Sequence, residues 1–294
     1  MKKVLKIAGI VVLILVLLAV ALAVKLLLDL RKQAERQAID QANMVKTDEE
    51  LLGQHLYIPR EGKEPVDVNL YLPESGSGLP VVFNLHGGAF IAGDADTLDT
   101  QSQRISGDWN AVVVTVNYTL AKDGVSIEYG TEEVADTIRY FLENAADYRI
   151  DPEKAVVLGY SAGGNHAMMA ALALQREGIR LAGQVLCYSF TGEAVSIYGA
   201  LTEEQRKTAS PALFILADGD PISDGSLAYE EALREQGVAT QVKKYDGAIH
   251  GFIEENNPEY EELFSKQSKS PEQEVLARDA ERYIGQWLAE VLAP

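Results

Sequence analysis

The fold is decided by residues 155–164, which read AVVLGYSAGG. The apolar first half of this stretch predicts a buried strand, and the apolar run of residues 165–174 predicts a helix directly after it. A Gly-x-Ser-x-Gly sequence between a strand and a helix is typical of a sharp turn that exposes a nucleophilic serine. Ser161 is therefore the candidate nucleophile. Gly159 and Gly163 are expected where a Cβ would clash as the strand and helix ends approach each other.

Length, charge and cysteine content limit the class of protein. The 294 residues suffice for one α/β domain and an N-terminal extension. The formal charge is −18, and since residues 1–40 carry a net charge of +4, the rest carries −22. A body this acidic disfavours binding to nucleic acid and to anionic lipid headgroups. Cys187 is the only cysteine, so no intrachain disulfide can form, and its apolar surroundings predict a buried thiol.

The N-terminal region resembles a membrane anchor. Residues 7–24 carry no charge and follow three lysines. About 17–25 apolar residues cross a bilayer as a helix, so residues 1–31 are predicted to be a single-pass transmembrane anchor whose residues 7–24 contact the lipid bilayer. The preceding lysines favour a cytoplasmic N-terminus, which places the catalytic domain at the cell membrane, outside the cytoplasm. The alternative is a cleaved signal peptide and a secreted protein.

The rest of the chain divides into a short helical segment and one large domain. Residues 32–53 continue as an amphipathic helix, either a stalk or a cap over the active site, and residues 54–294 form the catalytic domain. Strands are predicted at residues 55–59, 66–72, 80–85, 111–116, 155–160, 185–189, 212–217 and 240–245. Helices are predicted at residues 131–146, 165–174, 227–236 and 272–292. The first two strands form an antiparallel pair, and the alternation that follows predicts a mostly parallel sheet with helices on both faces.

A serine hydroxyl becomes nucleophilic when a base takes its proton and an acid orients that base. His250 and an aspartate from the run of residues 218–224 follow Ser161 in the order Ser, Asp, His, and each comes directly after a predicted strand. His250 is the candidate base. Asp218, Asp220 and Asp224 are the candidate acids, and Asp220 is favoured because Asp224 can open the next helix and Asp218 can belong to a turn.

The predicted strand of residues 80–85 ends at His86-Gly87-Gly88-Ala89-Phe90. Acyl transfer places negative charge on the carbonyl oxygen, and backbone N–H groups that point at this oxygen stabilise it. Two glycines let the backbone approach the substrate closely. The predicted oxyanion-hole donors are therefore Gly87, Gly88 and Ala162, and His86 is expected to hold the loop by a hydrogen bond. His166, on the helix after the serine, and His55 are expected to be structural.

Together these segments resemble the bacterial hormone-sensitive-lipase-like esterases of the α/β-hydrolase fold. The resemblance is carried by HGGAF at residues 86–90, NYTLA at 117–121, GYSAGGN at 159–165, DPISD at 220–224 and HGF at 250–252. It implies an α/β-hydrolase fold with a small cap. It also implies carboxylester hydrolysis with Ser161 as nucleophile, Asp220 as acid and His250 as base.

The chain departs from the family pattern at several positions. Ala89 stands where the family usually has a third glycine, Tyr160 where an acidic residue is common, and Thr119 where the family has arginine. Only residues 190–210 lie between two core strands as a cap, which implies an open, shallow pocket and short-chain esters. The candidate residues lining the substrate pocket are Phe90, Tyr118, Tyr160 and Phe252.

The sequence therefore predicts a membrane-anchored serine carboxylesterase that acts on short-chain acyl esters. The mechanism needs no cofactor, the histidines lack metal-ligand spacing, and no metal is expected. An acyltransferase or peptidase of the same fold, held near immobile substrate by the anchor, is the alternative. A binding module on a hydrolase scaffold is a third hypothesis, since fold alone does not determine function. The sequence leaves the oligomeric state open.

Overall fold

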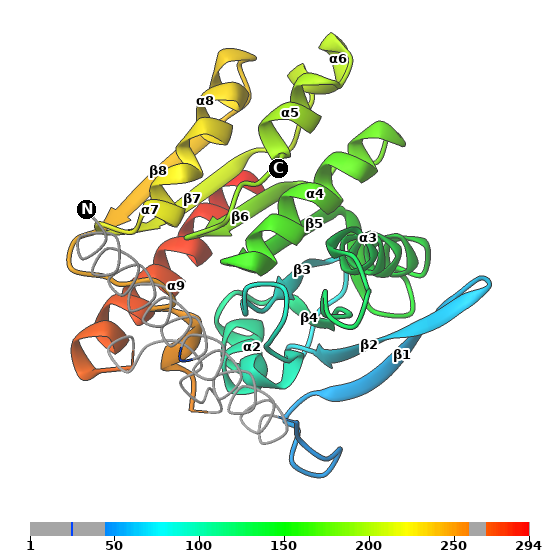
Figure 1. Ribbon diagram of the computed structural model, residues 1–294. Coiled ribbons are helices and arrows are strands. Elements are labelled where there is room, and N and C mark those ends of the chain that lie inside the picture. The colour runs from blue at the N-terminus through cyan, green and yellow to red at the C-terminus, as the bar shows by residue number, and fades with distance from the viewer. Residues whose placement is uncertain (1–24, 26–44, 259–268, 294) are drawn as a thin grey trace, which may run out of the picture. The chain divides into compact units, whose positions relative to one another are not determined.

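An eight-stranded sheet is the centre of the computed structural model, which describes residues 25, 45–258 and 269–293 (Figure 1). The strands are β1 (Gln54–Arg60), β2 (Lys63–Tyr71), β3 (Leu79–Leu85), β4 (Val112–Asn117), β5 (Ile150–Tyr160), β6 (Gly183–Cys187), β7 (Ala212–Ala217) and β8 (Thr240–Tyr245). Their order across the sheet is β1-β2-β4-β3-β5-β6-β7-β8. β2 is antiparallel to both β1 and β4, and the other neighbouring pairs are parallel. The predicted mostly parallel sheet is therefore confirmed.

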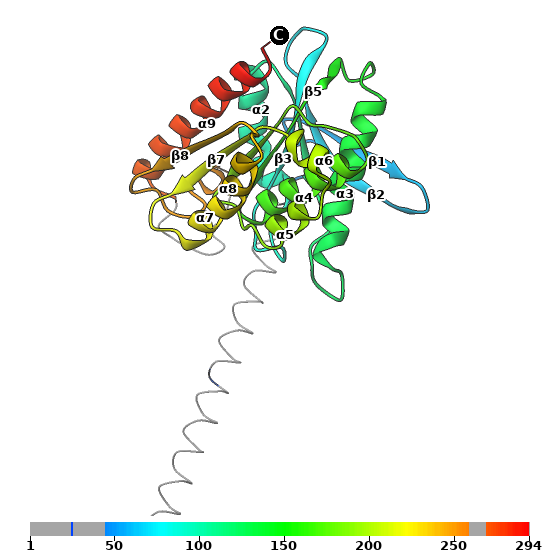
Figure 2. The same ribbon diagram turned by 90° about the horizontal axis from the view of Figure 1, so that it is seen from above.

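Helices cover both faces of this sheet, as Figure 2 shows. One face packs against α3 (Ile127–Glu143), α4 (Ala162–Arg176), α5 (Ala194–Gly199) and α8 (Leu227–Glu235), and the other against α2 (Asp99–Asp108) and α9 (Pro271–Val291). The shorter helices are η1 (Ala95–Leu98), α6 (Glu203–Lys207), α7 (Pro221–Gly225) and η2 (Glu254–Asn256). Each face has its own apolar core, so the central strands β3, β4, β6 and β7 are buried on both sides and read as nearly continuous apolar runs. Every residue of β7, for example, is buried.

Helix α2 was not predicted from the sequence because the side that it turns to the sheet is polar. Asp99 and Gln101 are fully buried there. Asp99 accepts hydrogen bonds from the Tyr71 hydroxyl at 2.9 Å and from Lys46 Nζ at 2.6 Å, and Gln101 accepts one from Tyr160 at 3.2 Å. Hydrogen bonds take the place of apolar contacts at this interface, so no apolar periodicity marks the helix.

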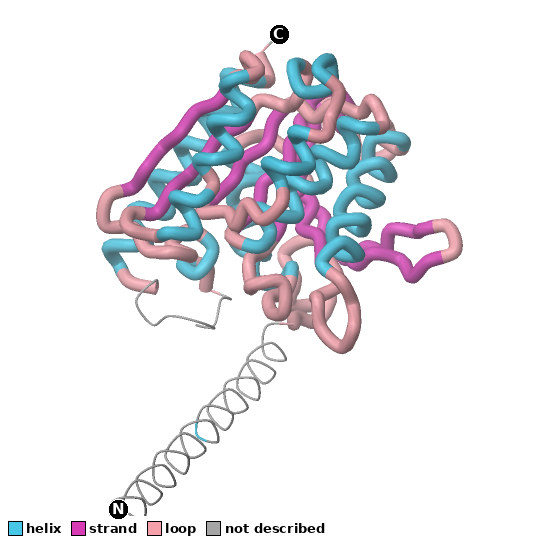
Figure 3. The backbone as a smooth tube through the Cα atoms, turned by 45° about the horizontal axis from the view of Figure 1, so that its top comes forward, coloured by secondary structure: helices cyan, strands magenta, loops and turns pink. Residues whose placement is uncertain are grey.

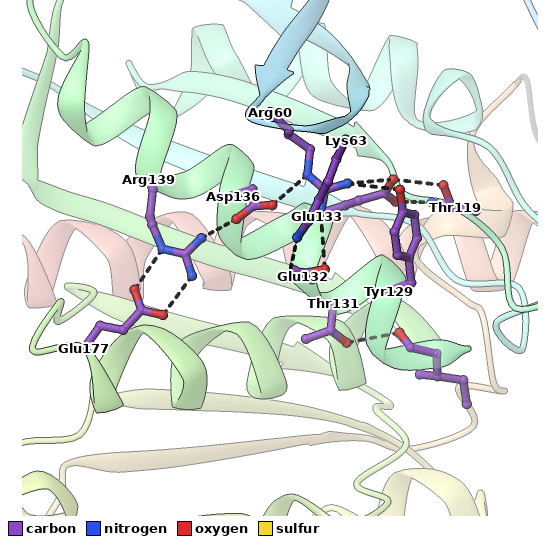
Figure 4. Close-up of polar contacts among 11 residues, drawn as sticks. Arg60, Lys63, Thr119, Tyr129, Thr131, Glu132, Glu133, Asp136, Arg139 and Glu177 are labelled. Atoms are coloured by element: carbon purple, nitrogen blue, oxygen red, sulfur yellow. Dashed lines mark hydrogen bonds and ion pairs between the residues drawn. The ribbon is translucent and has the colours of Figure 1, made fainter. Parts of the chain in front are cut away.

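A polar network ties α3 to the first strand and to α4 (Figure 4). The buried Arg60 guanidinium on β1 donates to Asp136 at 2.6 Å. Asp136 also accepts from Arg139, which forms a two-pronged ion pair with Glu177 just beyond α4, at 2.8 Å for each bond. Bidentate pairs of this kind fix orientation as well as distance. The network holds α4, which follows the candidate nucleophile, while the β1–β2 hairpin extends outward past α3 (Figure 3).

The predicted N-terminal segments fall mostly outside the described residues. This applies to the anchor at residues 1–31 apart from Lys25, and to residues 32–44 of the predicted stalk or cap. Within the described parts of the chain, no helix combines the length and the apolar composition that crossing a bilayer requires. Residues 45–53 form turns rather than the predicted helix. Their backbone is bound elsewhere, because the N–H groups of Lys46 and Leu52 donate to the carboxylates of Asp96 and Asp99.

Candidate active site

Ser161 lies between the end of β5 and the start of α4, with a backbone φ of 50° and ψ of −113°. A non-glycine residue adopts such angles only where its surroundings enforce them. Here a Cβ on Gly159 would lie 2.3 Å from the Gly163 carbonyl oxygen, and a Cβ on Gly163 would lie 2.3 Å from that of His86. The predicted approach of the strand and helix ends is confirmed at Gly159, whereas Gly163 is restricted by the end of β3 and not by β5. Gly164 is restricted too, because a Cβ there would lie 1.8 Å from the Ser189 hydroxyl oxygen.

The three candidate catalytic side chains meet at one edge of the sheet. His250 Nε2 lies 2.8 Å from Ser161 Oγ, and His250 Nδ1 lies 2.7 Å from Asp220 Oδ2. Ser161 follows β5, Asp220 follows β7 and His250 follows β8. These strands are parallel, so their carboxyl ends lie at the same edge of the sheet. Since the Asp220 carboxylate can only accept, Nδ1 donates to it, which leaves Nε2 free to take the serine proton. The site has the arrangement that nucleophilic catalysis needs.

Asp220 is held by the helix that it begins. As the N-cap of α7, it accepts hydrogen bonds from the N–H groups of Ile222 at 3.0 Å and Ser223 at 3.3 Å. Burial alone would raise the pKa of Asp220, but the hydrogen bond and charge of His250, together with these two amides, outweigh it and hold the pKa below its usual value. The carboxyl therefore stays ionised at neutral pH and can stabilise an imidazolium at His250.

The other two candidate acids lie beside a lysine instead. Asp218 and Asp224 both lie near Lys244 Nζ, at 3.3 Å and 3.6 Å. Asp224 does not begin the helix after it as expected, because it lies inside α7 and Ser226 is the N-cap of α8. Of the three aspartates, only Asp220 is in contact with His250.

The predicted oxyanion hole needs one correction, at Gly87. Its N–H donates to the buried carboxyl of Glu254 at 2.7 Å, so it is not available to a substrate oxygen. The N–H groups of Gly88, Ala89 and Ala162 have no acceptor among the described residues. Ala89 is therefore a third available donor that the sequence analysis passed over. Its φ of 52° belongs to the left-handed region, and the substitution of alanine for glycine leaves the N–H in place.

The remaining histidines have structural partners, as the sequence analysis expected. His86 Nδ1 lies 2.7 Å from the Gly87 carbonyl oxygen, and burial lowers its pKa to about 4, so the neutral ring holds the loop. His166 Nδ1 lies 2.8 Å from Thr131 Oγ1, and burial lowers its pKa to about 3. His55 lies on β1 and pairs with aspartates on the surface.

Of the four predicted pocket residues, only Phe90 lies at a pocket. Tyr118, Tyr160 and Phe252 are at most 1% exposed and belong to the core. Tyr118 stacks on His86 and donates to its carbonyl at 2.7 Å. Tyr160 precedes the serine on a strand, where successive side chains point to opposite faces, so it points toward α2. Phe252 packs against other aromatic rings behind the site.

Phe90 and Phe190 line a pocket of about 240 Å³ beside the serine. Their rings meet edge to face at a centroid distance of 6.0 Å. The N–H of Phe190 donates to the Ser161 carbonyl at 3.2 Å, and that of Asn165, also in the lining, donates to the same oxygen at 3.3 Å. Two residues of the lining are therefore hydrogen-bonded to the backbone of Ser161, although Ser161 itself is not part of the lining. Its other lining residues are Ile127, Glu128, Thr131, Met169, Gly192 and Glu193.

Thr119, which replaces the family's arginine, is also accounted for. It donates twice to the buried Glu133 carboxylate, from its N–H at 2.6 Å and its hydroxyl at 2.9 Å (Figure 4). Arg60 lies 3.5 Å from the same carboxylate and supplies a positive charge from a different strand. Among the described residues, no group of three or more His, Cys, Asp or Glu side chains is arranged to hold a metal ion.

Comparison with known proteins agrees with this geometry. A family model described as "alpha/beta hydrolase fold" matches residues 82–210 and 193–254, which include all three candidate catalytic residues. The chain belongs to this family. It is a hydrolase of the carboxylesterase type, among the serine esterases that resemble hormone-sensitive lipase.

Curated relatives of this hydrolase are esterases of moderate similarity. An ethyl acetate hydrolase of Pseudomonas putida is 27% identical over 75% of this chain and 82% of its own length. A carboxylesterase of Mycobacterium tuberculosis is 28% identical over 66% of this chain and 73% of its own length.

Solved structures share the fold of this hydrolase. An esterase of Pyrobaculum calidifontis has a TM-score of 0.68 at 23% identity and covers 90% of this chain and 92% of its own. A thermostable carboxylesterase from a metagenomic library has a TM-score of 0.67 at 21% identity, with 90% and 96% covered.

Proposed function

We propose that this hydrolase cleaves short-chain carboxylic esters through an acyl-enzyme on Ser161. The observation that carries the proposal is the continuous hydrogen-bond path from Ser161 Oγ to His250 and on to Asp220, at 2.8 Å and 2.7 Å. His250 takes the serine proton as the hydroxyl attacks the ester carbonyl. It then gives that proton to the leaving alcohol, and water repeats the cycle on the acyl-enzyme.

The tetrahedral intermediate carries a negative charge that the N–H groups of Gly88, Ala89 and Ala162 would stabilise. Their lack of acceptors among the described residues supports this role. Loss of one such donor reduces kcat by about 10²–10³-fold in serine hydrolases. Gly87 is excluded because its N–H already donates to Glu254.

The preference for short acyl chains is supported by the size of the pocket at Phe90 and Phe190, about 240 Å³. The segment that could cap this pocket contains only the short helices α5 and α6. A small pocket excludes long acyl chains sterically, while a methyl or propyl group fits. The name of the Pseudomonas putida relative, an ethyl acetate hydrolase, fits a small substrate as well.

The test uses the full-length chain in detergent and p-nitrophenyl esters with acyl chains of two to twelve carbons. We expect the highest kcat/KM for acetate or butyrate and a decline of roughly tenfold or more by the octanoate. Ser161→Ala should lower kcat by at least about 10³-fold. A decrease below tenfold in that variant would refute the acyl-enzyme mechanism at Ser161. A wild-type chain that hydrolyses none of these esters would favour a binding module.

An acyltransferase or peptidase remains the alternative for the same nucleophile. Adding an alcohol or amine acceptor to the reaction and analysing the products separates the two. Hydrolysis predicts free acid as the main product at acceptor concentrations far below that of water. A transferase predicts that the acylated acceptor replaces the acid.

We propose, on the sequence of residues 7–24 alone, that the protein is anchored in the cell membrane with its catalytic domain outside the cytoplasm. Fractionation of cells that express a C-terminally tagged chain tests this. An uncleaved anchor keeps the tag in the membrane fraction and leaves it accessible to external protease, whereas a cleaved signal peptide releases a shorter soluble protein.

A further inference from the structure

Glu254 is a buried carboxyl that the proposed reaction does not use. It lies four residues after His250, at the start of η2, and is 2% exposed. Its Oε2 accepts the Gly87 N–H at 2.7 Å, across 167 positions of sequence. A Cβ on Gly87 would lie 2.4 Å from Glu254 Oε1, so the carboxyl leaves no room for a side chain at Gly87. This side chain joins the segment that carries the base to the loop that carries the oxyanion donors.

The loop has backbone angles that need such support. Gly88, Ala89 and Phe90 have φ values of 124°, 52° and 67°, and the last two are unfavourable for residues that have a Cβ. Conformations of this kind persist only where surrounding contacts enforce them. The far end of the loop is held by backbone bonds, with Gly88 O accepting from Ala92 at 2.9 Å and Phe90 O from Ala121 at 2.7 Å. At the near end, Glu254 holds the peptide immediately before the donors.

Glu254 is fixed on its own side as well. Its N–H donates to the Tyr188 hydroxyl at 3.3 Å, and the Tyr188 ring lies edge-on to the His250 ring at a centroid distance of 5.1 Å. Tyr188 follows β6 and is fully buried. The contact therefore locks the carboxyl, the base and the loop into one packed unit, in which a shift of one displaces the others.

The surroundings of the carboxyl raise its pKa, so that it is partly neutral near pH 7. Burial raises the pKa of Glu254 to about 7, against the opposing effects of the Gly87 N–H and the charge of His250. No lysine or arginine among the described residues offsets this burial. The titratable groups that feel its charge come from several elements: Tyr118, Tyr160, Cys187, Tyr188 and His250. A hydrogen-bond acceptor that is partly neutral can stand beside an oxyanion with less repulsion than a full carboxylate.

We propose that Glu254 is a positioning residue for the oxyanion hole, acting as the acceptor that holds the Gly87 N–H away from the cleft so that the N–H groups of Gly88 and Ala89 face the substrate oxygen. The inference rests on the proposed esterase reaction. It assigns Glu254 no contact with the substrate and no proton transfer. What it requires of the side chain is an acceptor at this place and not a negative charge.

The experiment compares Glu254→Gln, which keeps an acceptor of the same shape, with Glu254→Ala, which removes it. Both are made in the full chain and assayed with p-nitrophenyl acetate. Because the oxyanion forms only in the transition state, we expect Glu254→Ala to lower kcat by about 10²-fold while KM changes less than about threefold. Glu254→Gln should keep kcat within about threefold of wild type at pH 6. The inhibition constant of an alkylboronic acid, which forms a tetrahedral adduct with the serine, should weaken in parallel with kcat/KM in the alanine variant.

Two further variants separate positioning from stability. Glu281→Gln is the control, because it alters another buried carboxyl. Glu281 lies on α9 and is paired with Arg104 of α2 at 2.9 Å and with Arg278 of α9 at 2.8 Å. It should lower the melting temperature, and any loss of kcat should be no larger than the change in KM. Gly87→Ala is the second probe and keeps Glu254 itself. Its new Cβ displaces the carboxyl, and we expect a fall in kcat with little change in KM.

The outcomes distinguish this inference from the proposed function. If the wild-type chain hydrolyses esters but Glu254→Ala retains kcat within threefold, the positioning role is refuted and the esterase remains. A Glu254→Gln variant as inactive as the alanine variant also refutes it, because charge and not an acceptor would then be what the loop needs. If Glu254→Ala does not fold, Gly87→Ala and Glu254→Gln decide by the same criteria. A wild-type chain without esterase activity refutes the function itself.

Discussion

Asp220 contacts both the candidate base His250 and the first turn of helix α7, and two substitutions separate the effects of these contacts. Its carboxylate orients His250 and caps α7 through the N–H groups of Ile222 and Ser223. Asparagine caps helices about as well as aspartate does, whereas alanine costs about 1 kcal/mol. Asp220→Asn should therefore keep nearly all of the wild-type stability and Asp220→Ala should lose about 1 kcal/mol.

The effect on catalysis should be much larger than the effect on stability. An amide at position 220 can donate to His250 Nδ1, which favours the tautomer with its proton on Nε2, and that nitrogen can then no longer accept from Ser161. Substitutions of this kind lower kcat by roughly 10⁴-fold in serine hydrolases, equivalent to about 5 kcal/mol of transition-state stabilisation. The loss is expected in kcat with p-nitrophenyl acetate at pH 7.5.

The assay for stability is urea unfolding of the wild type and the same two variants at pH 7.5 and pH 2.5. Since folding lowers the pKa of Asp220 from its usual 3.8, its ionisation stabilises the fold above that value, and this stabilisation is lost as the pH falls through the folded pKa. As the pH falls below 3.8, the wild type should therefore lose stability that Asp220→Asn, which has no titrating group at this position, does not lose. A kcat within tenfold of wild type in Asp220→Asn would refute this account of the acid.

Three further predictions concern the core and the pocket. Gly164→Ala should cost about 1–3 kcal/mol, because its Cβ would lie 1.8 Å from Ser189 Oγ, and adding Ser189→Gly should recover most of the loss in a double-mutant cycle measured by urea unfolding. Burial raises the pKa of Glu254 from 4.5 to about 7, so folding becomes less favourable as the pH rises between these values, by about 3 kcal/mol in total. Glu254→Gln should flatten this dependence of the unfolding free energy between pH 5 and pH 8. An unchanged slope would contradict the prediction. Phe190→Ala should enlarge the 240 Å³ pocket and raise kcat/KM for p-nitrophenyl octanoate relative to the acetate by roughly tenfold, while an unchanged ratio would place the acyl chain elsewhere.

Much of the fold could be predicted from the sequence where burial leaves an apolar pattern. β7 has the predicted bounds because all six of its residues are buried and apolar. β8 has the predicted bounds too, although its exposure alternates. Helix α2 has no such pattern, because its inner side binds the neighbouring elements through polar groups such as Asp99.

The three candidate catalytic residues could be predicted from their order in the chain. The hydrogen bonds that hold the loop at residues 86–90 could not. Ser161, Asp220 and His250 could be selected because each follows a strand and the three come in the expected order. The two glycines after His86 look equivalent in sequence, and only a contact with a residue 167 positions later distinguishes Gly87 from Gly88. Glu254 itself stands in a polar run that resembles a surface loop, so nothing local indicates its burial.

The contact between Gly87 and Glu254 also bears on synthesis of the chain from its N-terminus. A chain synthesised as far as residue 200 contains Ser161 and the loop at residues 86–90, but neither the proposed base nor the glutamate that we propose supports the loop. Both follow within five residues of each other, at 250 and 254. On the proposed roles, the nascent chain gains its base and the support of its oxyanion loop almost together, once synthesis has passed β8 and reached residues 250–254.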